Sequence, residues 1–118
     1  MQTNDKEYAA EITRATTPCF SIYLTDEEDN PLDLSQYEDI KITIKQFENT
    51  LISKSTKAGT ATIDGENVII ELTQDETLRF QPGTAYIQPH LLTTSGKAYA
   101  DKDIQKIKVH DILDGGAI

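Results

Sequence analysis

The sequence predicts an all-β fold, an antiparallel β-sandwich of about seven strands built as one domain. Apolar and polar residues alternate along most of the 118-residue chain, which places successive side chains in a core and in water. Turn pairs such as Asp64-Gly65 and Ser95-Gly96 separate these runs at short intervals. Helical patterning is confined to one short turn from Thr73 to Leu78. A small closed barrel is the alternative, because local pattern does not decide how sheets close.

The expected strands follow one another from the first alternating run to the last. Residues 20–24 and 40–45 show the alternation most clearly, with apolar side chains at every second position. The other expected strands are Thr50 to Ser55, Thr60 to Asp64, Val68 to Leu72, Thr84 to Thr94, and a last pair spread over Lys97 to Val109.

The helical turn is expected because its first residues form a capping box. Thr73 can accept a hydrogen bond from the amide of Glu76, and the Glu76 side chain can accept one from the amide of Thr73. Leu78 and Phe80 are then expected to pack into the core and hold this turn against it.

Pro89 interrupts the longest expected strand. Proline cannot donate a ladder hydrogen bond, so this strand is expected to lie at a sheet edge or to bulge at Pro89.

Composition excludes several classes of function. The chain has 20 acidic and 11 basic residues, a net charge of -9 and 37% hydrophobic residues, which are values of a soluble globular protein. A net anion is repelled by nucleic acid and by anionic lipid, so neither is an expected partner. No apolar run approaches the ~18 residues of a membrane span, and the polar first ten residues do not resemble a signal peptide. The single cysteine, Cys19, cannot form an internal disulfide and is expected to be a buried or half-buried bystander.

The negative charge is concentrated between Asp26 and Asp39. Seven acids and no Lys or Arg occupy these 14 residues, which we interpret as a solvated loop between two strands. Leu32 and Leu34 are expected to return the chain toward the core. The hard oxygens of this stretch suit calcium, but the spacing and central glycine of an EF-hand loop are missing.

The residues of a catalytic or metal site are not recognisable. His90 and His110 are the only histidines, and neither has a cysteine or acid at the spacing of a known metal signature. A nucleophile elbow is missing, and Gly115-Gly116 has too few residues after it to open a phosphate-binding helix. We therefore expect no catalytic, cofactor-binding or metal-ligating residues and no cofactor.

Four segments together resemble a family of phage and prophage tail-region structural proteins with an Ig-like β-sandwich, similar to the N-terminal domain of the baseplate upper protein. These segments run from Ile12 to Pro18, Leu72 to Phe80, Thr94 to Ala100 and Val109 to Leu113. The resemblance covers Ile12 to Ile118, so residues 12–118 are expected to form the sandwich and residues 1–11 a flexible N-terminal segment. Ala15 and Pro89 depart from the family, which often has a glycine at the first position and a polar or basic residue at the second.

The resemblance implies a non-enzymatic structural protein that acts through protein–protein contacts in tail or baseplate assembly. Its expected partners are other phage structural proteins or further copies of itself, and its expected location is the virion after synthesis in the host cytoplasm. The alternative is a glycan- or calcium-binding sandwich that attaches to host surfaces.

The strand pattern also predicts where lysines point. If Ile42, Ile44, Ile107 and Val109 face inward, four lysines project outward and form a basic face if their strands are neighbours: Lys41, Lys45, Lys106 and Lys108. We hypothesise that the acidic loop of one subunit meets this face on another subunit or on a partner protein.

Overall fold

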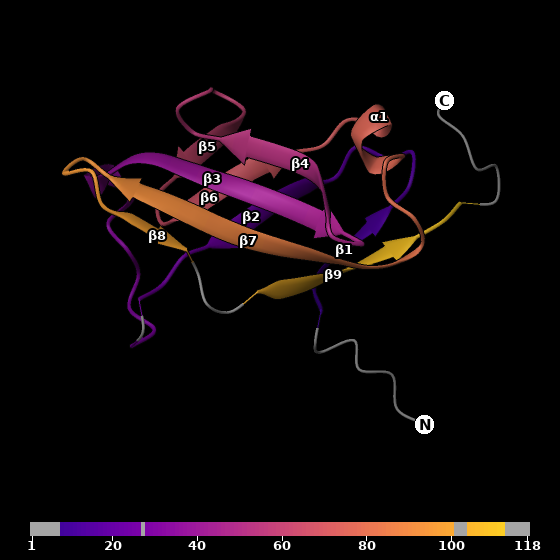
Figure 1. Cartoon of the computed structure of the whole chain (residues 1–118), viewed down its shortest axis with the longest axis horizontal. Helices are drawn as coiled ribbons and strands as arrows, with labels where there is room; N and C mark the ends of the chain where they lie inside the picture. Colours follow the sequence, from indigo (N-terminus) through magenta and orange to yellow (C-terminus); the bar gives the residue numbers. More distant parts are fainter. Residues whose placement is uncertain (1–7, 27, 101–103, 113–118) are drawn as a thin grey trace.

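The fold is described from a computed structural model, which covers residues 8–26, 28–100 and 104–112. Two sheets pack face to face, and the larger lies in front of the smaller in Figure 1. The larger sheet has the order β1-β9-β7-β3-β4, with β8 also paired to β7, and the smaller has the order β2-β6-β5. The strands of the larger sheet are β1 (Tyr8–Thr13), β3 (Tyr37–Gln46), β4 (Asn49–Ser55), β7 (Gly83–Thr93), β8 (Ala98–Ala100) and β9 (Gln105–His110). Those of the smaller are β2 (Cys19–Tyr23), β5 (Ala61–Asp64) and β6 (Asn67–Glu71).

The order of the strands is that of an Ig-like sandwich. β2, β5 and β6 take the places of strands B, D and E, while β3, β4, β7 and β9 take those of C, C′, F and G in the variable-type arrangement. β1 runs parallel to β9, and every other pair is antiparallel. The expected all-β Ig-like sandwich is confirmed, and the two sheets do not close into a barrel.

Side chains at alternate positions of both sheets form one core. Ile40, Ile42 and Ile44 on β3 are completely buried and face Val68 and Ile70 of the smaller sheet across this core. Lys41, between the first two of these, and Lys45, after the third, are exposed. The alternation read from the sequence therefore separates inside from outside on this strand.

The N-terminal boundary of the sandwich differs from the expected one. β1 starts at Tyr8, so residues 8–11, expected to precede the domain, lie in the larger sheet. The reason is pairing with the far end of the chain, because Ile12 stands opposite Val109 and is completely buried. Residues 1–7 of the expected flexible segment lie outside the described residues.

Pro89 occupies a position that neither expectation foresaw. It is buried near the middle of β7, which lies between β3 and the β8/β9 side, and its register with β3 continues without a bulge opposite Ile42. On the other side of β7, pairing with β9 ends at Ile87 and pairing with β8 begins at His90. Pro89 thus falls where β7 changes partners, the place in a central strand where a missing amide donor disrupts least.

The expected helical turn is confirmed as α1 (Gln74–Thr77), with the capping box between Thr73 and Glu76 complete. Phe80 is completely buried behind it, and Leu78 is half-buried. Among the described residues, no helix is long and apolar enough to cross a bilayer.

This turn also ties the two sheets together. It follows β6 of the smaller sheet, yet Glu76 bonds Lys54 of β4 in the larger sheet, with Nζ to Oε2 at 2.7 Å. Arg79, just after α1, donates from Nη1 to the carbonyl of Leu51 at 3.0 Å. Part of the open edge of β4 is therefore covered, which protects it from pairing with another strand.

Candidate functional site

The side of the larger sheet that faces away from the core carries four lysines. We call this surface the outer face and define it by the outward residues of three adjacent strands. Within the described part of the chain, it is opposite the side covered by the smaller sheet. Its residues are Lys41, Thr43 and Lys45 of β3, Tyr86, Gln88 and His90 of β7, and Lys106 and Lys108 of β9.

The register of the strands arranges these residues in rows. The condition stated for a basic face, that β3 and β9 are neighbours, is not met, because β7 lies between them. Lys45 stands opposite Tyr86, and Tyr86 stands opposite Lys106, so a tyrosine separates two lysines along one row. Strands two places apart are ~10 Å apart, so the four lysines still share one face.

Among the described residues, Glu11 and Asp39 border the outer face, and both have hydrogen-bond partners. Glu11 of β1 bonds His110 of β9, with Oε1 to Nε2 at 2.9 Å. Asp39, at the start of β3, accepts from the amide of Lys57 at 3.1 Å. Burial raises the pKa of Asp39, but the hydrogen bonds that it accepts, led by the Lys57 amide, outweigh burial and hold this pKa below its ordinary value. The hydrogen bonds of Glu11 and Asp39 printed here therefore go to His110 and to the Lys57 amide, which lie outside the outer face.

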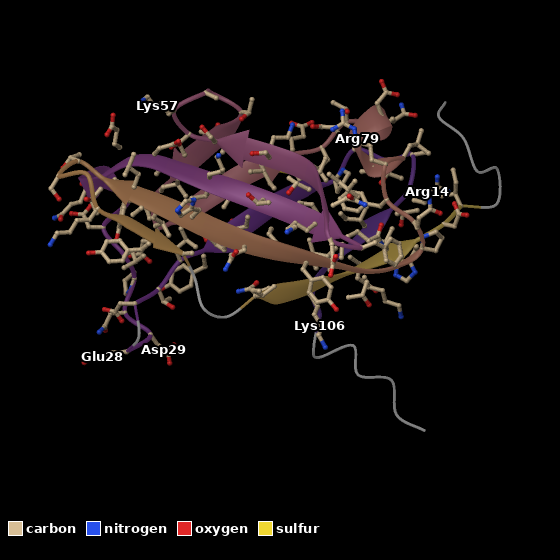
Figure 2. The ribbon with its side chains drawn as sticks, in the orientation of Figure 1. Arg14, Glu28, Asp29, Lys57, Arg79 and Lys106 are labelled. Atoms are coloured by element: carbon tan, nitrogen blue, oxygen red, sulfur yellow. The ribbon has the colours of Figure 1, made fainter. Side chains whose placement is uncertain are left out.

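The acidic stretch lies at one end of the sandwich. As expected, it joins β2 to β3, with an isolated bridge between Thr25 and Pro31 at its base. Its last residues differ from the expected loop, because Glu38 and Asp39 already belong to β3. Figure 2 shows Glu28 and Asp29 at the tip of this connection, far from Arg14 at the other end of the molecule.

Two aspartates shape the connection through their own carboxylates. Asp26 accepts hydrogen bonds from the amides of Asn30 and Glu28, at 3.0 and 2.8 Å, and these bonds lower its pKa. Asp33 accepts from the hydroxyl and amide of Ser35, which lowers its pKa as well. Both groups therefore stay ionised well into the acidic range, and the end keeps its charge.

Asp33 also starts a short 3-10 turn (η2, Leu34–Gln36) that leads into β3. Leu34 on this turn is buried and Leu32 is half-buried, as the sequence predicts. The turn thereby holds the connection against the body of the sandwich.

A shallow groove of about 510 Å³ opens between this connection and the β5–β6 turn. Its apolar lining includes Ile63, a β5 residue that is 42% exposed, and acids stand at its rim. We call this region the acidic end; it consists of the groove residues Pro31, Leu32, Asp33, Leu34, Ile63 and Glu66 together with Asp26, Glu28, Asp29 and Asp64.

The structure does not gather the polar candidates into a reactive site. His90 lies on the outer face opposite Lys41, and His110 is held by Glu11 on a different strand pair. In residues 8–26, 28–100 and 104–112, no three His, Cys, Asp or Glu side chains form a group that could hold a metal ion. Gly115-Gly116 lies outside the described residues.

Cys19 differs from expectation. It is exposed on β2, where the neighbouring Phe20 and Ile22 take the inward positions. The prediction that it is buried or half-buried was wrong, because the alternation of its own strand, and not the general preference of cysteine for the interior, decides its side.

Comparison with known proteins adds little beyond the fold. No family model matches the chain, and no curated protein matches it. Murine CRIg has 11% identity and a TM-score of 0.43, over 87% of this chain and 92% of that one. The first Ig-like domain of human CD48 antigen has 14% identity and a TM-score of 0.38, over 94% of this chain and 88% of that one. Scores below 0.5 leave the Ig-like assignment to the strand order and pairing described above.

Proposed function

We propose that this chain is a non-enzymatic structural domain of a phage or prophage tail region, which acts through protein–protein contacts made by its outer face. The observation that carries the proposal is a sheet face with four lysines and a 43% exposed tyrosine on a protein of net charge -9. Tyrosine is enriched at protein interfaces, and charge of one sign selects a partner surface of the other sign.

Several features support contact rather than catalysis. The outer face is formed by three paired strands, and His90 on it lies on a different strand from His110, which is bonded to Glu11. A surface built on paired strands suits docking, because few of its groups lose conformational freedom when a partner binds. The tail-region assignment is supported by the resemblance of the four segments named above.

The proposal is tested in two steps. Particles induced from the source strain are purified and their proteins are identified by mass spectrometry. The purified chain is then titrated against each product of the neighbouring genes at about 50 and about 500 mM NaCl. We expect the chain in the particles and salt-sensitive binding to at least one acidic neighbour.

A matched pair of variants connects this binding to the outer face. Lys45→Glu, on the face, is expected to weaken it, whereas Lys57→Glu makes the same charge change on the β4–β5 connection and is expected to leave it unchanged. Absence from particles together with no binding to any neighbour contradicts the proposal. Binding of an oligonucleotide by this face contradicts it as well, and a melting temperature raised by calcium or a glycan favours the alternative ligand-binding module.

A further inference from the structure

The charge on the outer face determines how two copies of this chain can meet. A two-fold contact between two outer faces would place the lysines of one copy against those of the other. Like charges brought together at an interface oppose association, so this symmetric contact is disfavoured. The acidic end carries the opposite charge and lies on the same molecule, which leaves an asymmetric contact between the two surfaces.

The two surfaces also match in their apolar parts. On the outer face, Tyr86 projects between Lys45 and Lys106 along one row and is 43% exposed. At the acidic end, the groove has an apolar lining that includes the 42% exposed Ile63, and its rim carries Asp33 and Glu66. The outer face thus presents an aromatic ring flanked by cations, and the acidic end presents its chemical counterpart, an apolar groove flanked by carboxylates.

We propose that the row Lys45–Tyr86–Lys106 of one copy docks on the groove of the acidic end of a second copy. In this contact Tyr86 covers Ile63, and the two lysines face the carboxylates of Asp33 and Glu66. This inference rests on the proposed function as a protein-contact domain and names the partner. Because the two surfaces differ, the contact is head-to-tail and produces either a closed ring or an open filament.

Sedimentation velocity of the full chain over a concentration series measures the association. We expect the dissociation constant to rise at least about tenfold between about 50 and about 500 mM NaCl, because exposed charges are screened at the higher salt concentration. Lys45→Glu and Tyr86→Ser are each expected to weaken association at least about tenfold. Lys57→Glu, the control of equal charge change, is expected to alter it less than about twofold.

A charge exchange between the surfaces gives the sharpest test. A face variant carries Lys41→Glu and Lys45→Glu, and an end variant carries Glu28→Lys and Glu66→Lys. All four positions are exposed, and melting curves of each variant verify that the fold is retained. Each variant alone presents like charges at the contact and is expected to be monomeric. The chain with all four changes again has opposite signs at the changed positions of the two surfaces and is expected to associate within about tenfold of the original chain.

The outcomes separate this inference from the proposed function. A chain that is monomeric at low salt, or that associates equally well after the face or end reversal, overturns the inference. If that chain still binds a neighbouring tail protein, the proposed function stands. Association that follows the charge exchange, in a protein that is absent from particles and binds no neighbouring product, supports the inference and overturns the proposed function.

Discussion

Removal of the Glu76 carboxylate is expected to loosen the connection between the two sheets. Oε1 of Glu76 accepts from the Thr73 amide at 2.9 Å and from Lys54 Nζ at 3.0 Å, and Oε2 lies 2.7 Å from the same Nζ. The side chains of Lys54 and Glu76 are only 13% and 15% exposed. In Glu76→Ala, the Lys54 ammonium would stay largely buried without its partner.

The expected loss is large for a domain of this size. Breaking a buried ion pair costs about 3–5 kcal/mol, and the low end applies here because both side chains retain some contact with water. Loss of the capping box adds about 1 kcal/mol. Glu76→Ala is therefore expected to lower the free energy of unfolding by about 3–4 kcal/mol, out of the ~5–15 kcal/mol of a typical domain. Urea unfolding at neutral pH measures it.

The same carboxylate makes stability depend on pH. Burial raises the pKa of Glu76, but hydrogen bonds from Lys54 and the Thr73 amide outweigh it, so this pKa lies below the ordinary 4.5 of a glutamate. A lowered pKa in the folded state gives stability that is complete above pH 4.5 and is lost as the pH falls through the folded value. Glu76→Gln is expected to remove this acid step from a plot of unfolding free energy against pH.

A double-mutant cycle of Glu76→Gln with Lys54→Met isolates the pair. We expect a coupling of at least about 1 kcal/mol. Additivity within about 0.3 kcal/mol, or an acid step that persists in Glu76→Gln, would refute the reasoning that this ion pair joins the sheets.

Three further predictions concern a hairpin, a buried amide and the cysteine. The β3–β4 turn holds Phe47 and Glu48 at φ 53° and 67°, a conformation that L residues other than Asn and Asp adopt at a cost. Glu48→Gly is therefore expected to raise the free energy of unfolding by about 0.5–1 kcal/mol. A lower free energy of unfolding in urea would contradict this. Gln46 is 2% exposed, accepts from the Gln81 amide at 2.7 Å and donates to the Gln81 carbonyl at 2.8 Å. Gln46→Leu is therefore expected to lower the free energy of unfolding by about 2–3 kcal/mol. A loss below about 0.5 kcal/mol would show that water replaces these bonds. Cys19 is expected to react with a maleimide in the folded protein nearly as fast as in urea, and protection of more than about a hundredfold would contradict its exposed position.

Some features of the fold are local and could be read from the chain itself. The alternation along residues 40–45 and the capping box at Thr73 each depend on neighbours within a few positions, and both have the expected geometry. The alternation of β2 could also have placed Cys19, whose outward position follows from inward Phe20. The general preference of cysteine for burial was the weaker signal because it ignores the strand on which the residue lies.

The candidate site depends on residues that are distant in sequence, and only part of it could be predicted. The outward direction of Lys41, Lys45, Lys106 and Lys108 follows from their strands, whereas the position of Tyr86 between Lys45 and Lys106 requires the register of three strands. The exposed Ile63 lay in an expected strand and gave no sign of a groove. Most of its neighbours there come from the β2–β3 connection, about 30 positions earlier in the chain.

The sequence by itself determined the class of the fold, the inward and outward sides of most strands and the acidic connection, because these follow from periods and turns within short segments. Only the tertiary structure decided that β7 separates β3 from β9, that β1 joins β9 from residue 8, and that Pro89 is buried where β7 changes partners. The physical reason is that strand pairing depends on contacts between residues throughout the core, most of them distant in sequence. Alternation says which way a side chain points, and it does not say which strand lies beside it.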